Sequence, residues 1–115
     1  MSRFNRFIFL IVLAASTLKL SSQGTVKGKV LDSLKVPVGY AIVGLYNSGD
    51  SSLQKGVYTN PEGEYLIPSI RKGSYFLKST VMNTGASYSP IFTLDSLETK
   101  VLPDILLHKL PFDLD

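Results

Sequence analysis

The stretch TNPEGEYLIPSIRKGSY, residues 59–75, contains two glycine turns ten residues apart, and a tyrosine stands two positions after each glycine. Apolar and polar residues then alternate briefly, and a period of two is typical of a strand that buries one face. We expect Gly63 and Gly73 to adopt backbone angles that other residues resist. We expect Tyr65 and Tyr75 to begin strands whose alternate side chains fill the space between two sheets.

The same period of two extends outward from this stretch in both directions. Turn residues separate the apolar segments at about the 8–12 residue spacing of an all-β sandwich or barrel, and no segment has the period of a helix. The sequence therefore predicts an all-β domain of seven short strands, either a sandwich or a barrel. Pro103 interrupts the last segment, which predicts an edge position or a bulge there. The expected strands are residues 25–32, 39–47, 53–59, 64–68, 74–81, 88–94 and 100–107.

Strand alternation also predicts which residues form the core. Residues 39–47 are apolar at both sets of alternate positions, which is typical of a strand in the centre of its sheet. The predicted core and turn residues are Gly28, Val30, Ala41, Val43, Leu45, Asn60, Gly63, Tyr65, Gly73, Tyr75 and Leu77.

The first 22 residues have the form of a secretory signal peptide. Arg3 and Arg6 precede an apolar run at residues 7–15. This run is too short for a membrane-spanning helix, which needs about 20 apolar residues. We expect residues 1–22 to be a signal peptide helix, with cleavage after either residue 16 or residue 22. A single domain at residues 24–108 and a short tail at 109–115 follow.

Removal of this segment changes the charge of the chain. Three of the 12 basic residues lie within residues 1–22, whereas all 9 acidic residues follow it, so the net charge falls from +3 to zero. A neutral chain without a basic run lacks the electrostatic basis for binding nucleic acid. The chain also has no cysteine, which excludes both disulfides and a lipid-modified N-terminal cysteine. We therefore expect an exported protein whose membrane association is only indirect.

Five short motifs occur in order along residues 24–107. They are a glycine, valine and aspartate at Gly28, Val30 and Asp32; A-x-V-x-L from Ala41; T-N-x-x-G-x-Y from Thr59; G-x-Y-x-L from Gly73; and D-I-x-L from Asp104. In this order and spacing they resemble the carboxypeptidase regulatory-like domain family. The resemblance implies a seven-stranded antiparallel Greek-key β-sandwich of the prealbumin-like or transthyretin-like kind, without catalytic activity of its own.

The resemblance also implies a setting. In Bacteroidetes such a domain behind a signal peptide commonly forms the N-terminal extension of TonB-dependent receptors and related outer-membrane β-barrel proteins. The expected function is therefore a non-catalytic interaction domain in the periplasm or at the outer membrane, with an envelope protein as its partner. A truncated fragment of a larger outer-membrane protein is an alternative that would leave the same residues.

Catalytic and metal-binding patterns are weak. His108 is the sole histidine, and it lacks the cysteine or histidine partners that a metal site or a nucleophile relay requires. The carboxylates of Asp50, Glu62 and Glu64 do not have the spacing of a calcium loop. We expect no enzyme activity and no cofactor, and a hydrolase of the transthyretin-like kind ranks last among the alternatives.

Aromatic residues support a second function, carbohydrate binding. Sandwiches of this kind occur in sugar-binding modules that stack sugars on aromatic rings. The chain has no tryptophan, and aromatic residues are also ordinary strand residues. The candidate stacking residues for a polysaccharide are Tyr40, Tyr46, Tyr58, Tyr88 and Phe92.

Overall fold

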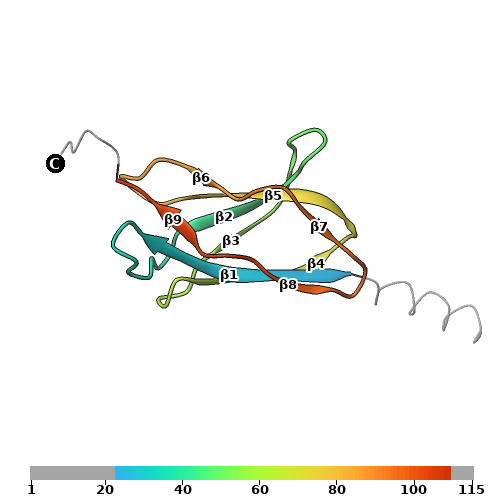
Figure 1. Ribbon diagram of the computed structural model, residues 1–115, viewed down its shortest axis with the longest axis horizontal. Coiled ribbons are helices and arrows are strands. Elements are labelled where there is room, and N and C mark those ends of the chain that lie inside the picture. The colour runs from blue at the N-terminus through green and yellow to red at the C-terminus, as the bar shows by residue number, and fades with distance from the viewer. Residues whose placement is uncertain (1–22, 110–115) are drawn as a thin grey trace, which may run out of the picture.

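Two β-sheets packed face to face form the protein (Figure 1). The computed structural model describes residues 23–109, a range that contains strands and turns but no helix, and hence none long and apolar enough to cross a membrane. In the first sheet β1 lies between β4 and the pair β8 and β9; in the second, β2 lies between β3 and β5, with β6 and β7 beside β5. The strands are β1 (Gly24–Asp32), β2 (Ile42–Asn47), β3 (Leu53–Tyr58), β4 (Glu64–Ile70), β5 (Gly73–Thr80), β6 (Ser87–Tyr88), β7 (Phe92–Leu94), β8 (Thr99–Val101) and β9 (Ile105–Leu107).

Nine strands form instead of the predicted seven, because the last two predicted segments are each divided. Residues 89–91, which include Pro90, separate β6 from β7. Residues 102–104, which include Pro103, separate β8 from β9. Proline has no N–H to donate to a ladder, so it is confined to edges and bulges. Both divided strands lie at an edge of their sheet, as the sequence predicted for Pro103.

The prediction of a fully antiparallel sandwich is wrong for one edge, because β8 and β9 both run parallel to β1. The chain enters β8 from β7 in the opposite sheet, so no hairpin fixes the direction of β8. Parallel neighbours need a long crossover, and here the whole segment from β2 to β7 provides it. The other pairs are antiparallel. The predicted signal peptide helix lies outside the described residues.

The core lies between the sheets and consists of alternate strand residues. Ala41, Val43 and Leu45 all point inward and are fully buried, and β2 is central in its sheet as its sequence predicted. Each buried valine or leucine side chain contributes about 1.5–3 kcal/mol, and this burial replaces the stabilisation that disulfides give other small domains. The buried apolar residues are Val26, Val30, Ala41, Val43, Leu45, Tyr65, Ile67, Ile70, Tyr75, Leu77, Leu94, Ile105 and Leu107.

The turn between β3 and β4 is built on Asn60 and Gly63. The Asn60 side-chain oxygen accepts hydrogen bonds from the backbone N–H groups of Glu62 and Glu64 at 3.0 and 2.9 Å. Gly63 has a φ of 76° and its N–H donates to the Asn60 carbonyl at 2.9 Å. The Val30 N–H in turn donates to the Gly63 carbonyl at 2.8 Å. The turn is therefore fastened to β1 as well as closed on itself.

Thr59 fastens the same turn to the segment before β2. Its side chain is buried, and its hydroxyl donates to the Val38 carbonyl at 2.7 Å while accepting from the Ala41 N–H at 2.9 Å. The Thr59 N–H also donates to the Ala41 carbonyl at 2.9 Å. One buried hydroxyl thus satisfies two backbone groups that the loop would otherwise leave unpaired.

Gly28 and Gly73 make room for tyrosine rings and do not adopt unusual backbone angles. Of the glycines within the described range only Gly63 has a positive φ, so the predicted unusual angle at Gly73 is absent. A Cβ at Gly28 would lie 2.8 Å from the Cζ atom of Tyr65, its antiparallel partner in β4. A Cβ at Gly73 would lie 3.2 Å from the hydroxyl of Tyr75, which donates to the Arg71 carbonyl at 2.7 Å. Each glycine leaves room for a tyrosine ring.

Lys55 joins the two sheets along one side. The register of β1 against β4 shifts between Gly24 and Val26, and Ser69 opposite this shift has a φ of 61°. Such a bulge removes backbone groups from the ladder. The Lys55 ammonium group, reaching across from β3, donates to the Pro68 and Ser69 carbonyls at 2.7 and 2.8 Å. The bulge and the lysine together close this side of the sandwich.

Candidate binding surface

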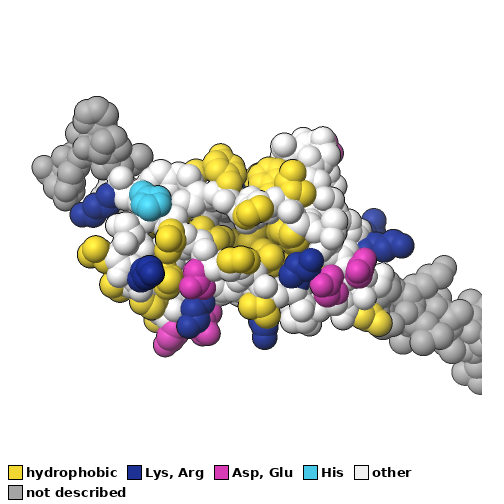
Figure 2. All heavy atoms as spheres, in the orientation of Figure 1, with side chains coloured by type: hydrophobic (Ala, Val, Ile, Leu, Met, Phe, Trp, Pro, Cys, Tyr) yellow, Lys and Arg dark blue, Asp and Glu magenta, His cyan; other side chains and the backbone are white. Residues whose placement is uncertain are grey.

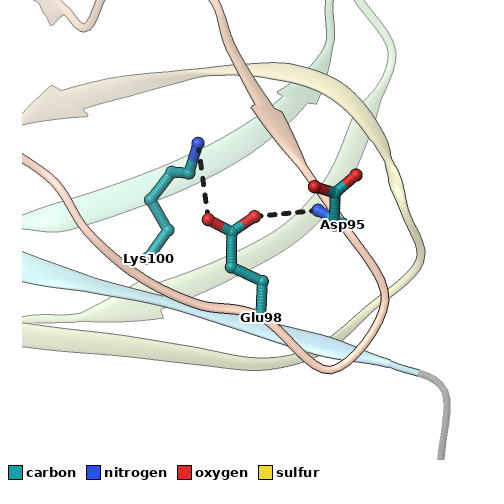
Figure 3. Close-up of polar contacts among 3 residues, drawn as sticks. All are labelled: Asp95, Glu98 and Lys100. Carbon is teal, nitrogen blue, oxygen red and sulfur yellow. Dashed lines mark hydrogen bonds and ion pairs between the residues drawn. The ribbon is translucent and has the colours of Figure 1, made fainter.

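The outer face of the first sheet mixes charged side chains with the exposed apolar side chains of Leu66, Val101 and Leu106. It carries Lys27 and Lys29 on β1, and Lys29 lies opposite Glu64 of β4. At the turn into β8, the Glu98 carboxylate accepts the Asp95 N–H at 2.9 Å and pairs with the Lys100 ammonium at 3.7 Å (Figure 3). Exposed pairs of this kind contribute at most about 1 kcal/mol. This face therefore resembles an ordinary solvated protein surface.

The outer face of the second sheet is apolar. Its exposed or half-buried side chains span four adjacent strands, and Lys78 is the one charged residue among the outward-pointing positions of these strands. Contiguous exposed apolar patches are uncommon on soluble monomers and mark interaction sites. We call this surface the aromatic face. It consists of Ile42 and Tyr46 from β2, Leu53 and Tyr58 from β3, Phe76 from β5 and Tyr88 from β6.

Three rings form a row across the aromatic face. Tyr46 and Phe76 are antiparallel partners whose ring centroids lie 5.3 Å apart with planes only 9° from parallel. Tyr88 continues the row, with its ring 6.3 Å from that of Phe76 and tilted by 47°. A Cβ at Gly44 would lie 2.9 Å from the Tyr46 ring, so the absence of a side chain there lets the tyrosine lie against the sheet. Tyr88 is 62% exposed at the end of the row.

The structure brings together three of the five predicted stacking residues. Tyr46, Tyr58 and Tyr88 all lie on the aromatic face, whereas Tyr40 is exposed in the loop before β2, where its N–H donates to the Thr59 carbonyl at 3.0 Å. Phe92 in β7 points the other way and packs against the core.

Sequence reasoning missed Phe76, Ile42 and Leu53 as members of the aromatic face. Simple alternation within residues 74–81 would have placed Phe76 on the same side as Lys78. Leu53 faces outward because a register shift opposite Leu45 and Tyr46 moves it there, and alternation alone does not show such a shift.

A hollow of about 690 Å³ lies beside β1, where the gap between β8 and β9 leaves the sheet incomplete. Lys27, Lys29 and Asp104 line it together with Tyr65. The Tyr65 hydroxyl is buried without a hydrogen-bond partner. Burial and the nearby Asp104 carboxylate raise the pKa of Tyr65 to about 12. The phenol therefore keeps its proton at neutral pH and is no candidate for a general base.

A second hollow, of about 450 Å³, lies between the divided strands β6/β7 and β8/β9. Hydrophobic side chains gather along this line between the sheets (Figure 2). Ile91, Phe92, Leu102 and Leu106 line it, and the Ser87 hydroxyl donates to the Leu106 carbonyl at 2.6 Å at one end. The two proline breaks thus leave this side of the sandwich less completely closed than the side that Lys55 joins.

The acidic residues and the histidine of the described range do not gather into a metal site. Within residues 23–109 no three or more His, Cys, Asp or Glu side chains lie close enough together to hold a metal ion. His108 is exposed after β9, where its carbonyl accepts the Gly85 N–H at 3.2 Å. The chemistry of this part of the chain favours binding through apolar and aromatic contacts.

Comparison with protein-family models and with curated proteins finds no match for the chain. Solved structures do share its fold. The minor pilin GBS52 of Streptococcus agalactiae matches with a TM-score of 0.59 and 20% identity over 84% of this chain and 48% of the pilin. The Bacillus anthracis TIE protein matches with a TM-score of 0.59 and 20% identity over 77% of this chain and 17% of that protein.

Enzymes share the fold as well. Catechol 1,2-dioxygenase from Acinetobacter sp. ADP1 matches with a TM-score of 0.61 and 8% identity over 78% of this chain and 53% of the enzyme. The chain thus spans about half or less of each of these three proteins. At these identities the similarity establishes the β-sandwich fold, and the function has to be argued from the residues themselves.

Proposed function

We propose that the protein is a non-catalytic, exported interaction domain of the cell envelope. It serves as an accessory or N-terminal module of an outer-membrane β-barrel system of the TonB-dependent receptor type, with a sandwich of the carboxypeptidase regulatory-like, transthyretin-like kind. The N-terminal sequence supports export, and the ordered motifs support the type of system. The single observation that carries the interaction role is the aromatic face, on which a row of three aromatic rings lies beside exposed apolar side chains.

Docking on the aromatic face is consistent with its composition. Interface centres are enriched in tyrosine and phenylalanine, and the aromatic face has this property, with Lys78 as a single charged residue between Gly44 and Tyr88. Tyr58 and Tyr88 are 69% and 62% exposed, so a partner would remove much ring surface from water. The outer face of the first sheet carries exposed apolar residues too, but Lys27, Lys29 and Glu64 lie among them.

The proposal makes two experimental claims. An antibody against residues 24–115 is expected to detect the domain in periplasmic or outer-membrane fractions of the native cell, and detection in the cytoplasm alone would overturn export. A photo-crosslinking amino acid at Tyr88 is expected to capture an envelope protein, whereas the same amino acid at Val101 on the first sheet is not. Equal capture from both positions, or from neither, would contradict docking on the aromatic face.

Carbohydrate binding is the second candidate, favoured by the row of Tyr46, Phe76 and Tyr88. Exposed aromatic rings on a flat sheet can stack against sugar rings. Affinity electrophoresis in gels containing envelope polysaccharides would test it. Retardation that disappears in Tyr88→Ala but persists in Val101→Ala would favour a polysaccharide as ligand, and unchanged mobility in every gel would exclude the polysaccharides used.

A further inference from the structure

The four edge strands of the sandwich differ in how well they are protected against pairing with another strand. β4 carries Pro68 and a bulge. The edge formed by β6 and β7 is divided at Pro90, and the edge formed by β8 and β9 is divided at Pro103. Proline, bulges and interruptions are the devices that keep sheet edges from pairing. β3 has none of these over its regular part, residues 55–58, which pairs with β2 without a register shift. Of the edges in the described range, β3 is therefore the open one.

The glycine within β3 also differs from the other glycines in strands. A side chain covers the position that a Cβ would occupy at each of the others: Leu94 at Gly24, Tyr65 at Gly28, Tyr46 at Gly44 and Tyr75 at Gly73. At Gly56 a Cβ would meet nothing within 4 Å. An aromatic ring on a neighbouring strand commonly covers a glycine at a sheet edge. The open face of Gly56 therefore has the form of a site for a ring from an added strand.

The backbone of β3 determines which residues can pair with such a strand. The Thr59 N–H donates to the Ala41 carbonyl in the direction of β2. Because hydrogen bonding alternates along an antiparallel strand, Val57 also bonds toward β2, and the N–H and C=O groups of Gly56 and Tyr58 point away from it. Gly56 and Tyr58 also lie on the same face, two residues apart. The groups available for pairing thus belong to a glycine and a tyrosine.

We propose that two copies of this chain pair antiparallel along β3, about a two-fold axis at Val57. In this register Gly56 of each copy lies opposite Tyr58 of the other, and the two residues exchange both main-chain N–H···O bonds. The Tyr58 ring of each copy covers the open Gly56 of its neighbour. The same patch is used on both copies, as closed two-fold symmetry requires. The two second sheets become one continuous sheet, and their aromatic faces join.

Charge does not oppose this pairing. Lys55 is the one charged residue of β3, and its ammonium group is already bonded to the Pro68 and Ser69 carbonyls of the first sheet. The exposed side chain beside the axis, Tyr58, is apolar enough to gain from burial. Because the paired segment is short, the dimer is reversible and depends on concentration.

Gly56→Pro tests the main-chain bonds directly. The Gly56 N–H points away from β2, so proline removes a donor that the isolated sandwich does not use, a position that edge strands tolerate. Sedimentation of the purified protein is expected to show a concentration-dependent dimer whose dissociation constant rises about tenfold or more in Gly56→Pro. The matched control Gly56→Ala keeps the N–H and is expected to dimerise with a smaller loss of affinity, because its methyl group takes part of the space that the Tyr58 ring covers. Circular dichroism of each variant verifies the fold.

Val57→Cys tests the axis independently of any loss of stability. The sequence has no cysteine, so the introduced thiol is unique. Residues opposite each other in a non-hydrogen-bonded antiparallel pair have Cα atoms about 4.5 Å apart, within disulfide range. Mild oxidation is expected to crosslink Val57→Cys and to leave the control Val101→Cys monomeric.

A protein that stays monomeric at all concentrations, or a dimer that neither weakens in Gly56→Pro nor crosslinks through Val57→Cys, would overturn the inference. Both assays use the purified protein alone. The outcome is therefore separable from the search for an envelope partner.

Discussion

Gly63→Ala is expected to destabilise the protein severely although it adds a single methyl group. The left-handed conformation, with φ at 76°, costs an alanine about 1–2 kcal/mol. The added Cβ would also lie 2.6 Å from the Val30 carbonyl oxygen and 3.0 Å from the Val38 nitrogen, which are themselves hydrogen-bonded at 2.9 Å. Displacing that pair costs about 1 kcal/mol more. The free energy of unfolding should fall by about 2–3 kcal/mol.

Urea denaturation and thermal melting would measure this loss, which corresponds to a decrease in Tm of at least about 8 °C for a domain of this size. Gly56→Ala is the matched control, because its Cβ meets open space and its φ is not positive. The control should change stability by less than about 1 kcal/mol. If the two variants differ by less than about 0.5 kcal/mol, the claim that the turn at Gly63 is held by backbone geometry is refuted.

Three further perturbations have defined outcomes. Thr59→Val leaves the buried Ala41 N–H and Val38 carbonyl without this partner, so the free energy of unfolding in urea should fall by about 1–3 kcal/mol; no change would contradict the role of the hydroxyl. Lys55→Met frees the Pro68 and Ser69 carbonyls, and hydrogen exchange should rise in β3 and β4 but not in β9. The pKa of Tyr65 is raised to about 12 in the folded protein, above the unfolded value of about 10, so stability is complete below pH 10 and decreases by about 1.4 kcal/mol per unit up to pH 12. Tyr65→Phe should remove this part of the alkaline decrease; an identical decrease in both proteins would show that Tyr65 does not titrate as described.

The sequence predicted the sandwich well because alternation is a direct consequence of burying one side of a strand. Ala41, Val43 and Leu45 are buried in a central strand, and Pro103 lies at an edge, as their patterns indicated. The direction of β8 and β9 was not predictable in the same way. A period of two is identical for parallel and antiparallel neighbours, so it determines which side chains are buried but not how the chain returns to β1.

The candidate surface was predicted only in part for a related reason. Tyr46 and Tyr88 were identified by residue type, but whether they adjoin depends on the register between strands far apart in sequence. Phe76 joins them because β5 pairs with both β2 and β6, which no local pattern reveals. Gly56 is open and Gly44 is covered although both are glycines in strands, because the Tyr46 ring lies over Gly44 and no side chain reaches Gly56.

The parallel pairing of β1 with β8 and β9 has a mechanical consequence. β1 begins at one end of the long axis of the sandwich, and β9 ends at the other (Figure 1). Tension applied between these two points pulls the parallel strands past one another, so the hydrogen bonds of both pairs are loaded in shear and must break together instead of in sequence. A sandwich with this geometry can transmit a pulling force along a polypeptide and resist being unravelled from either end.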